Sequence, residues 1–470
     1  MATLVDLPEE LLCSICEKAE PSTLLSLAAS CKLLNRISGS QYLLFISRDS
    51  QDPFLSVADE VRMSFETSFE TLRNIMSIAG SISTVRFVSF QFSPSARKTL
   101  QQIRLATLLL QRIHHPLHSL EVNFNGVESD IPCFSPSFNM FPSFNGAFNG
   151  LLWEAYRLRY CSLRLAGIIP ITQDCFKFSP PINTSLSHIT VDATFLLSRA
   201  QREWLVGFLN ASKAIFYILA RGSEGWTYIL PNLSLPSLKD IAFIGRPTVT
   251  ASPIEIVAEF CNQHQNLRSI DCGPYQFRTS PTSKLGCQYP LSQLQVLRAS
   301  VSQLLYFVSD PSRLRNLEVI EIQWPEFDDD IASTSDHSST GLWHLFTFLC
   351  NRSSIRNLII PTNFPGLQKD VRSEAKSSLT STFPSLTMLQ LGDFKSLVEL
   401  ARQDFLKWVL KVFPSLKSLD FAYTGWDAEE TSCFARIVAK ELPSIENLTL
   451  DYKPRKVKDW IEDPSESTKA

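Results

Sequence analysis

Three stretches of the sequence bring together residue types that could hold a metal ion or carry thiol chemistry. Cys13 and Cys16 form a CxxC pair, residues 114–118 read HHPLH, and residues 328–330 are consecutive aspartates. Zinc and calcium sites need further ligands at characteristic spacing, and none accompany these residues. We therefore expect no metal and no cofactor: Cys16 falls on an apolar helical face and indicates a buried thiol, HHPLH marks a turn, and the aspartates fit a hydrated loop.

Catalytic motifs are missing as well. The sequence has no glycine-rich phosphate loop, no GxSxG nucleophile elbow and no HExxH zinc motif. His344 falls within an apolar helical run, where packing is the expected role. No nucleophile stands with its base, so we predict that the protein is not an enzyme in its own right.

Composition narrows the remaining classes of function. The 470 residues are 44% hydrophobic and 19% charged, with 44 basic and 47 acidic side chains and a net charge of −3. This near-neutral balance argues against a partner that is nucleic acid or a membrane surface. The eleven cysteines are scattered, the first twenty residues include Asp6, Glu9, Glu10 and Glu17, and no run of apolar residues is long enough to span a membrane. We expect a protein with reduced thiols in the cytoplasm, the nucleus or both.

Two short amphipathic helices are predicted at the start of the chain. Asp6 can cap the first helix, Pro21 separates it from the second, and Lys32 and Arg36 suit the end of the second helix. Their apolar positions recur at helical spacing: Leu7, Leu11, Leu12, Ile15, Cys16 and Ala19, then Leu24, Leu27, Ala28, Cys31 and Leu34. Roughly 40 residues are too few for an independent core, so another surface must cover part of these faces.

This opening stretch resembles an F-box. The resemblance rests on Leu-Pro, apolar residues at helical spacing, a proline between the helices, a leucine-rich second helix and a late cysteine. Ala19 and Leu34 depart from the family, which usually has a large apolar residue and a tryptophan there. The resemblance implies docking on a Skp-family adaptor, and through it on a cullin and a RING subunit. It implies the following adaptor-binding residues: Leu7, Pro8, Leu11, Leu12, Ile15, Leu24, Leu27 and Cys31.

A six-residue pattern with large apolar residues at i, i+3 and i+5 recurs along the rest of the chain. Clear copies begin at Leu117, Leu186, Leu238, Leu267, Leu294, Leu317, Ile355, Leu386, Leu416 and Ile445, and weaker ones at Ile82, Tyr160 and Ile215. An apolar helical segment precedes most copies, and Pro-Ser introduces four of them. Helix, turn and short strand at a period of roughly 23–31 residues are typical of a solenoid.

The repeats resemble a divergent leucine-rich-repeat array that mostly lacks the asparagine after the strand. The predicted fold class is α/β: an N-terminal helical F-box followed by a leucine-rich-repeat solenoid with a curved parallel sheet. We expect the F-box at 1–48, a helical linker at 49–80, about 13 irregular repeats at 81–453 and a tail at 454–470. A stack of plain βα units in two domains is the alternative fold.

Side chains alternate faces along a strand, so positions i+2, i+4 and i+6 should line the concave face of the sheet. Mixed charges there favour recognition of a target protein. The predicted target-binding residues are Arg164, Tyr217, Arg221, Asp271, Arg298, Glu321, Gln323 and Asp420, with Trp324 and Tyr423 as aromatic anchors at the rim.

Two insertions interrupt the repeats. Residues 133–150 carry five phenylalanines with no helical or strand period, and either fold back onto the repeats or offer a contact for a partner. Residues 324–340 are acidic and rich in serine, and residues 278–284 (RTSPTSK) could accept phosphate.

Together these features predict a substrate-recognition subunit of an SCF-type ubiquitin ligase. The F-box would bind the adaptor, and the repeats would bind an unknown target protein. An F-box scaffold that acts without ubiquitin transfer, and an enzyme with a pocket on the repeats, are the two alternatives.

Overall fold

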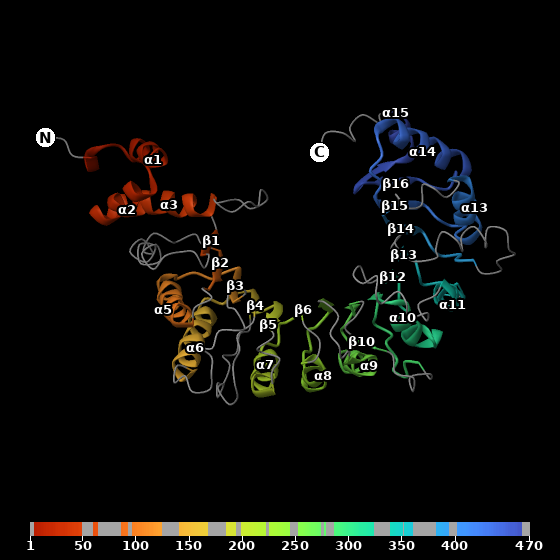
Figure 1. Ribbon diagram of the computed structural model, residues 1–470, viewed down its shortest axis with the longest axis horizontal. Helices are drawn as coiled ribbons and strands as arrows, with labels where there is room; N and C mark the ends of the chain where they lie inside the picture. Colours follow the sequence, from red (N-terminus) through yellow and green to blue (C-terminus); the bar gives the residue numbers. More distant parts are fainter. Residues whose placement is uncertain are drawn as a thin grey trace. The chain divides into compact units, whose positions relative to one another are not determined.

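The chain divides into two compact units, Met1–Leu238 and Lys239–Ala470. The structure is a computed structural model (Figure 1). It describes residues 4–48, 60–63, 86–92, 96–124, 141–167, 185–193, 199–221, 225–244, 252–273, 277–278, 286–323, 339–350, 352–360, 382–393 and 402–462.

The first unit, which we call unit 1, begins with helices and continues with alternating strands and helices. Its helices are η1 (Leu4–Asp6), α1 (Glu9–Glu17), α2 (Pro21–Ser30), α3 (Lys32–Arg48), α5 (Ala96–Arg112), α6 (Phe141–Arg157), α7 (Arg199–Ala211), α8 (Trp226–Ile229) and η5 (Leu230–Asn232). Its strands are β1 (Glu60–Met63), β2 (Phe87–Gln91), β3 (Ser119–Phe124), β4 (Ser162–Gly167), β5 (His188–Ala193) and β6 (Tyr217–Arg221). Each strand pairs in parallel with the next, and α5, α6 and α7 lie on one side of them (Figure 1).

The second unit, unit 2, repeats this arrangement. Its helices are α9 (Ile254–Gln263), α10 (Val301–Val308), η7 (Pro311–Arg313), α11 (Ser339–Leu349), α13 (Arg402–Val412), α14 (Ala428–Glu441) and α15 (Val457–Glu462). Its main-sheet strands are β7 (Asp240–Ile244), β9 (Ser269–Asp271), β11 (Val296–Ala299), β12 (Val319–Ile322), β13 (Asn357–Ile360), β14 (Met388–Asp393), β15 (Ser418–Tyr423), β16 (Asn447–Leu450) and β17 (Lys453–Lys456). All neighbouring pairs are parallel except β16–β17, and β8 (Ser252–Pro253) pairs separately with β10 (Phe277–Arg278).

The mixed α/β architecture with long, mostly parallel sheets confirms the expected fold class at that level. From β3 to β16, each strand other than β8 and β10 begins two residues after the start of a predicted hexamer. The i, i+3 and i+5 residues are buried throughout. In β13, for example, Leu358 (i+3) and Ile360 (i+5) are fully buried and alternate with half-buried Asn357 and Ile359. The alternation follows from the pleat, which turns successive side chains to opposite faces. We call the face with the half-buried positions the open face.

The Pro-Ser pairs make the turns that lead into the strands. The amide of Leu238 donates to the carbonyl of Leu235, and Leu386, Leu416 and Ile445 donate in the same way to the residue three positions earlier. The pair therefore occupies the two central positions of a β-turn, where the fixed φ of proline is favourable. This turn stops the helix and directs the apolar residue at position i into the core.

The structure differs from the sequence prediction at several places. The two predicted N-terminal helices are three: an extended Cys31 ends α2 after Ser30, so Lys32 and Arg36 belong to α3. The N-cap of α1 is Pro8 and not Asp6. Strand β1 lies inside the range predicted as a helical linker, and β2 follows the hexamer from Val85, not the one from Ile82. Because both hexamers have apolar residues at the required spacing, pattern alone could not choose between them. Residues 141–150 of the Phe-rich insertion form the first turns of α6, where Phe148 is buried against Phe124. The predicted tail from 454 is structured as far as Glu462.

The C-terminal elements close the sheet of unit 2. Strand β17 turns back antiparallel to β16, and the indole N–H of buried Trp460 donates to the carbonyl of Leu448 at 2.8 Å. The pairing register and the bond from the Val457 amide to the Glu446 carbonyl turn Pro454 outward. Proline has no N–H to offer there, so the outer edge is a poor template for another strand.

Candidate interaction surfaces

Helix α1 has two apolar sides, one buried and one exposed to solvent. Leu12 and Cys16 are buried, α3 contacts α1, and the Arg36 guanidinium pairs with the Glu9 carboxylate at 2.6 Å. Burial and, to a lesser degree, nearby Cys13 raise the pKa of the Cys16 thiol. This agrees with the prediction of a buried thiol and not a redox pair, because a reactive cysteine needs a lowered pKa.

The other side of the helix stays in solvent. Leu4, Leu7, Leu11 and Ile15 are exposed by 40%, 36%, 52% and 41%, and we call these four residues the leucine stripe. Leu11 and Ile15 are four residues apart and share one side of α1, while Leu4 of η1 and Leu7 lie just before this helix. A contiguous exposed row of large aliphatic residues is a mark of a protein-binding surface.

The predicted adaptor-binding residues divide between these two sides. Leu7, Pro8, Leu11, Ile15 and Cys31 are exposed, and Leu27 is half-buried. Leu12 and Leu24, which the prediction also assigns to adaptor binding, are 1% and 2% exposed and pack within the N-terminal helices. The sequence reasoning missed Leu4, although a large aliphatic residue three positions before Leu7 is a usable signal.

The open face of unit 1 carries charged pairs between neighbouring strands. Arg164 of β4 lies 3.4 Å from Glu121 of β3, and Arg221 at the end of β6 lies 2.9 Å from Asp192 of β5. The Ser89 hydroxyl also donates to Glu121. Parallel pairing in register places these side chains opposite each other, which is the geometry in which cross-strand pairs interact.

The open face of unit 2 has a similar ladder. Arg298 of β11 pairs with Glu321 of β12 at 2.7 Å. The Gln323 side-chain amide donates to Asp271 at 2.8 Å, and the Gly273 amide donates to the same carboxylate oxygen. The carbonyl oxygen of the Gln323 side chain is buried and accepts no hydrogen bond in the described part of the chain.

Among the predicted target-binding residues, those with described side chains all lie at open-face positions or directly after a strand. Arg164, Tyr217 and Arg221 belong to unit 1, whereas Asp271, Arg298, Glu321, Gln323 and Asp420 belong to unit 2. The two aromatic anchors remain predictions, because Trp324 lies outside the described residues and only the backbone of Tyr423 is described.

Asp420 differs from the other open-face carboxylates because no described cation lies near it. Burial also raises the pKa of Asp240 on β7, but Lys239, Arg298 and Arg268 oppose that shift. It lies on β15, between Gln390 of β14 and Thr449 of β16 in register. Its Oδ1 atom is buried, and no described group gives it a hydrogen bond. Burial raises the pKa of this carboxyl group above its ordinary value, because desolvation penalises the charged form.

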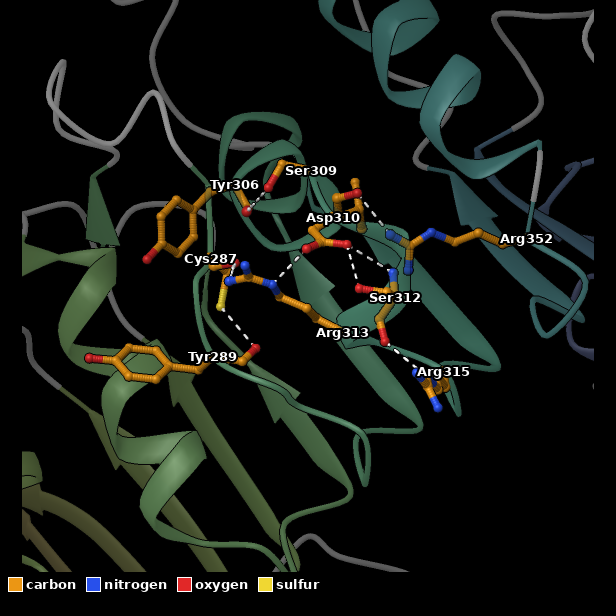
Figure 2. Close-up of polar contacts among 10 residues, drawn as sticks. Cys287, Tyr289, Tyr306, Ser309, Asp310, Ser312, Arg313, Arg315 and Arg352 are labelled. Atoms are coloured by element: carbon orange, nitrogen blue, oxygen red, sulfur yellow. Dashed lines mark hydrogen bonds and ion pairs between the residues drawn. The ribbon is translucent and has the colours of Figure 1, made fainter.

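The polar network of Figure 2 ties consecutive repeats of unit 2 together. Asp310 accepts hydrogen bonds from the backbone and hydroxyl of Ser312 and from Arg313, whose second nitrogen donates to the Cys287 carbonyl (Figure 2). Arg352, 6% exposed, donates to the Val308 carbonyl at the end of α10. A cation at a helix C-terminus is favourable, so this network fits a structural role.

Three buried thiols and the HHPLH turn are among the described groups to consider for thiol or histidine chemistry. Burial raises the pKa values of the Cys261, Cys272 and Cys287 thiols, which keeps them protonated. His118 of the HHPLH turn packs its ring against Phe87 at 5.1 Å. Within the described ranges, no three His, Cys, Asp or Glu side chains are grouped as metal ligands, and no described helix is long and apolar enough to cross a membrane.

Each unit thus belongs to the class of repeat proteins in which helix–strand units stack along a parallel sheet. The sequence matches no protein-family model and no curated protein. Among solved structures, one similar chain is the leucine-rich repeat-containing protein LegL7 from Legionella pneumophila, with 11% identity and a TM-score of 0.32. The similarity covers 84% of this chain and 94% of that chain. The fold is therefore defined by the chain's own sheets and helices and not by this similarity.

Proposed function

We propose that this chain is a leucine-rich-repeat binding protein that serves as the substrate-recognition subunit of an SCF-type ubiquitin ligase. The leucine stripe would dock on a Skp-family adaptor, which connects to a cullin and a RING subunit, and the repeats would bind the target protein. The observation that supports this best is the exposure of Leu11 and Ile15 on α1, and of Leu7 just before it, while Leu12 and Cys16 of the same helix are buried. An aliphatic row of this kind supplies the anchors of a protein interface.

The proposed mechanism is positional. One part of the chain holds the adaptor and another part holds the target, so that lysines of the target gain a high effective concentration near the ubiquitin carrier. The chain itself supplies no catalytic group and needs no cofactor in this scheme. Its place of action is the cytoplasm or the nucleus.

The test is co-purification of the full chain with the adaptor, using Leu11→Asp and Ile15→Asp. Each substitution places a charge at the centre of the apolar stripe, so we expect recovery of the adaptor to fall by about tenfold or more. Leu108→Asp is the matched control, because Leu108 is a leucine of α5 with 44% exposure outside the stripe.

Undiminished recovery of the adaptor with both variants would contradict the proposal. Recovery of the adaptor without the cullin would instead favour a scaffold that acts without ubiquitin transfer. Circular dichroism of each variant checks that the helices are retained.

A further inference from the structure

Described carboxylates on the two open faces have a cation or a hydrogen-bond donor near them, with Asp420 as the exception. Burial also raises the pKa of Asp240 on β7, but Lys239, Arg298 and Arg268 lie near that carboxylate and oppose the shift. Glu121 and Asp192 contact arginines in unit 1, Glu321 contacts an arginine in unit 2, and Asp271 accepts two hydrogen bonds. Asp420 has no hydrogen bond or ion pair among the described residues, although its Oδ1 atom is shielded from water. A desolvated acceptor without a donor costs free energy in the isolated chain.

No described lysine or arginine forms an ion pair with the Asp420 carboxylate. The open-face positions of β13 to β16 are occupied by Asn357, Ile359, Met388, Gln390, Ser418, Asn447 and Thr449 in addition to Asp420. Beyond Thr449 the register places Pro454, while Lys456 of β17 pairs with Asn447. The carboxylate is therefore surrounded by amides, hydroxyls and two aliphatic side chains.

Ile359 and Met388 provide the apolar part of this surface. Ile359 pairs in register with Gln390, and Met388 pairs with Ser418, so both lie within two residues and two strands of Asp420. Lysine and arginine combine a long aliphatic stem with a charged end, and they commonly lay the stem on apolar surface while the charge reaches a polar partner. An aliphatic platform that leads to an unpaired carboxylate fits such a side chain.

We propose that Asp420 receives a lysine or arginine side chain of the target protein, with the aliphatic stem resting on Ile359 and Met388. The inference depends on the proposed target-binding role of the repeats and specifies the chemistry of the contact. A cation supplies the donor that the chain itself does not provide, and a charge-assisted bond in a partly desolvated setting is stronger than one in water.

The raised pKa of Asp420 agrees with this geometry. An internal cation would lower the pKa of the carboxyl group, whereas burial without one raises it. Binding of a cationic side chain would reverse that direction.

The experiment is a selection of displayed short peptides on the full-length chain, with libraries that share a fixed central Lys, Arg, Gln or Glu and are random elsewhere. We expect wild type to enrich the Lys or Arg library over the Gln and Glu libraries, and Asp420→Asn to lower that preference by about tenfold, the cost of removing one charge from a partly buried pair. The separate Lys and Arg libraries show which cation is preferred. Glu429→Gln is the matched control, because it removes an exposed carboxylate from helix α14 of the same unit.

The inference would be overturned if wild type and Asp420→Asn enriched the Lys and Arg libraries equally. It would also be overturned if wild type showed no preference for these libraries over the Gln and Glu libraries. A lower melting temperature for Asp420→Asn than for wild type would also overturn it, because it would reveal an internal partner of the carboxylate. Co-purification with the adaptor reports separately on the proposed function, since the leucine stripe and Asp420 belong to different units.

Discussion

At the level of single residues, solvent exposure and neighbouring charges determine the pKa and the hydrogen bonding of each ionisable side chain. Glu321 and Asp420 both stand on the open face of unit 2, at the same position within their strands. Glu321 has Arg298 beside it, whereas burial without a cation raises the pKa of Asp420. The same chemical group is therefore part of the internal packing in one strand and an available acceptor in another.

His264 provides the clearest pH dependence. The imidazole is 6% exposed, its Nδ1 lies 2.8 Å from the Phe260 carbonyl, and burial lowers its pKa below the ordinary 6.5. Because the folded pKa lies below the unfolded one, the unfolded chain binds the proton first as the pH falls. The stability contributed by the neutral ring is complete above about pH 6.5 and is lost as the pH falls from there towards the folded pKa.

We predict that the free energy of unfolding falls between pH 7.5 and pH 5.5, and that His264→Gln reduces this fall. Urea denaturation at the two pH values measures it. His114→Gln, which changes an exposed histidine, should leave the pH dependence as it is. An unchanged slope for His264→Gln would show that other groups cause the effect.

At the level of elements, each strand is specified by its own hexamer, but its ends depend on neighbours. The C-terminal cap is the clearest case, since β17 and α15 have no hexamer of their own. Asp451 and Tyr452 adopt φ of 49° and 62° in the turn between β16 and β17, and Asp451 accepts hydrogen bonds from the amide and hydroxyl of Thr424. These bonds hold a backbone conformation that non-glycine residues rarely adopt.

Trp460→Ala tests whether this cap stabilises unit 2. Loss of a fully packed indole and of its bond to the Leu448 carbonyl should lower the free energy of unfolding by about 3–5 kcal/mol. Trp153→Ala is the control, because Trp153 of α6 is 50% exposed and its loss should cost less than about 1 kcal/mol. Thermal denaturation of both variants measures the difference, and equal melting temperatures would exclude a capping role.

At the level of the whole molecule, the chain consists of two compact units built on the same repeat. Repeats contact mainly their neighbours, so their stability depends on local interfaces. Leu358 is fully buried in β13, between β12 and β14. A cavity at this position should therefore destabilise the adjoining repeats of unit 2 most.

Leu358→Ala should lower the free energy of unfolding of unit 2 by about 2–5 kcal/mol, the usual cost of a cavity in a packed core. Hydrogen exchange followed by mass spectrometry should show faster exchange in β12, β13 and β14, with little change in β2 to β5. Exposed Leu108→Ala should leave exchange in both units close to that of wild type. Equal acceleration in β2 to β5 would mean that the chain unfolds as one cooperative block.

The sequence by itself determined the repeats. Spacing of i, i+3 and i+5 identified the strands from β3 to β16, because a buried face must be apolar at alternate positions and this requirement is local. It also identified α1, the start of α2 and the open-face positions, but not the break at Cys31 between α2 and α3. Residues 141–150 were missed as part of α6, because phenylalanines among Asn, Gly and Ser have weak helical preference until packing of Phe148 on Phe124 stabilises the turn.

Only the tertiary structure decided which of several suitable apolar or charged residues are used internally. Leu11 and Leu12 are adjacent leucines on one helix, yet Leu12 packs inside and Leu11 stays in solvent, because the choice depends on where the neighbouring helices lie. Likewise, no local pattern distinguishes Asp420 from Glu321. Pairing of a charge is set by the strand on either side, and those strands are about 30 residues away in the sequence.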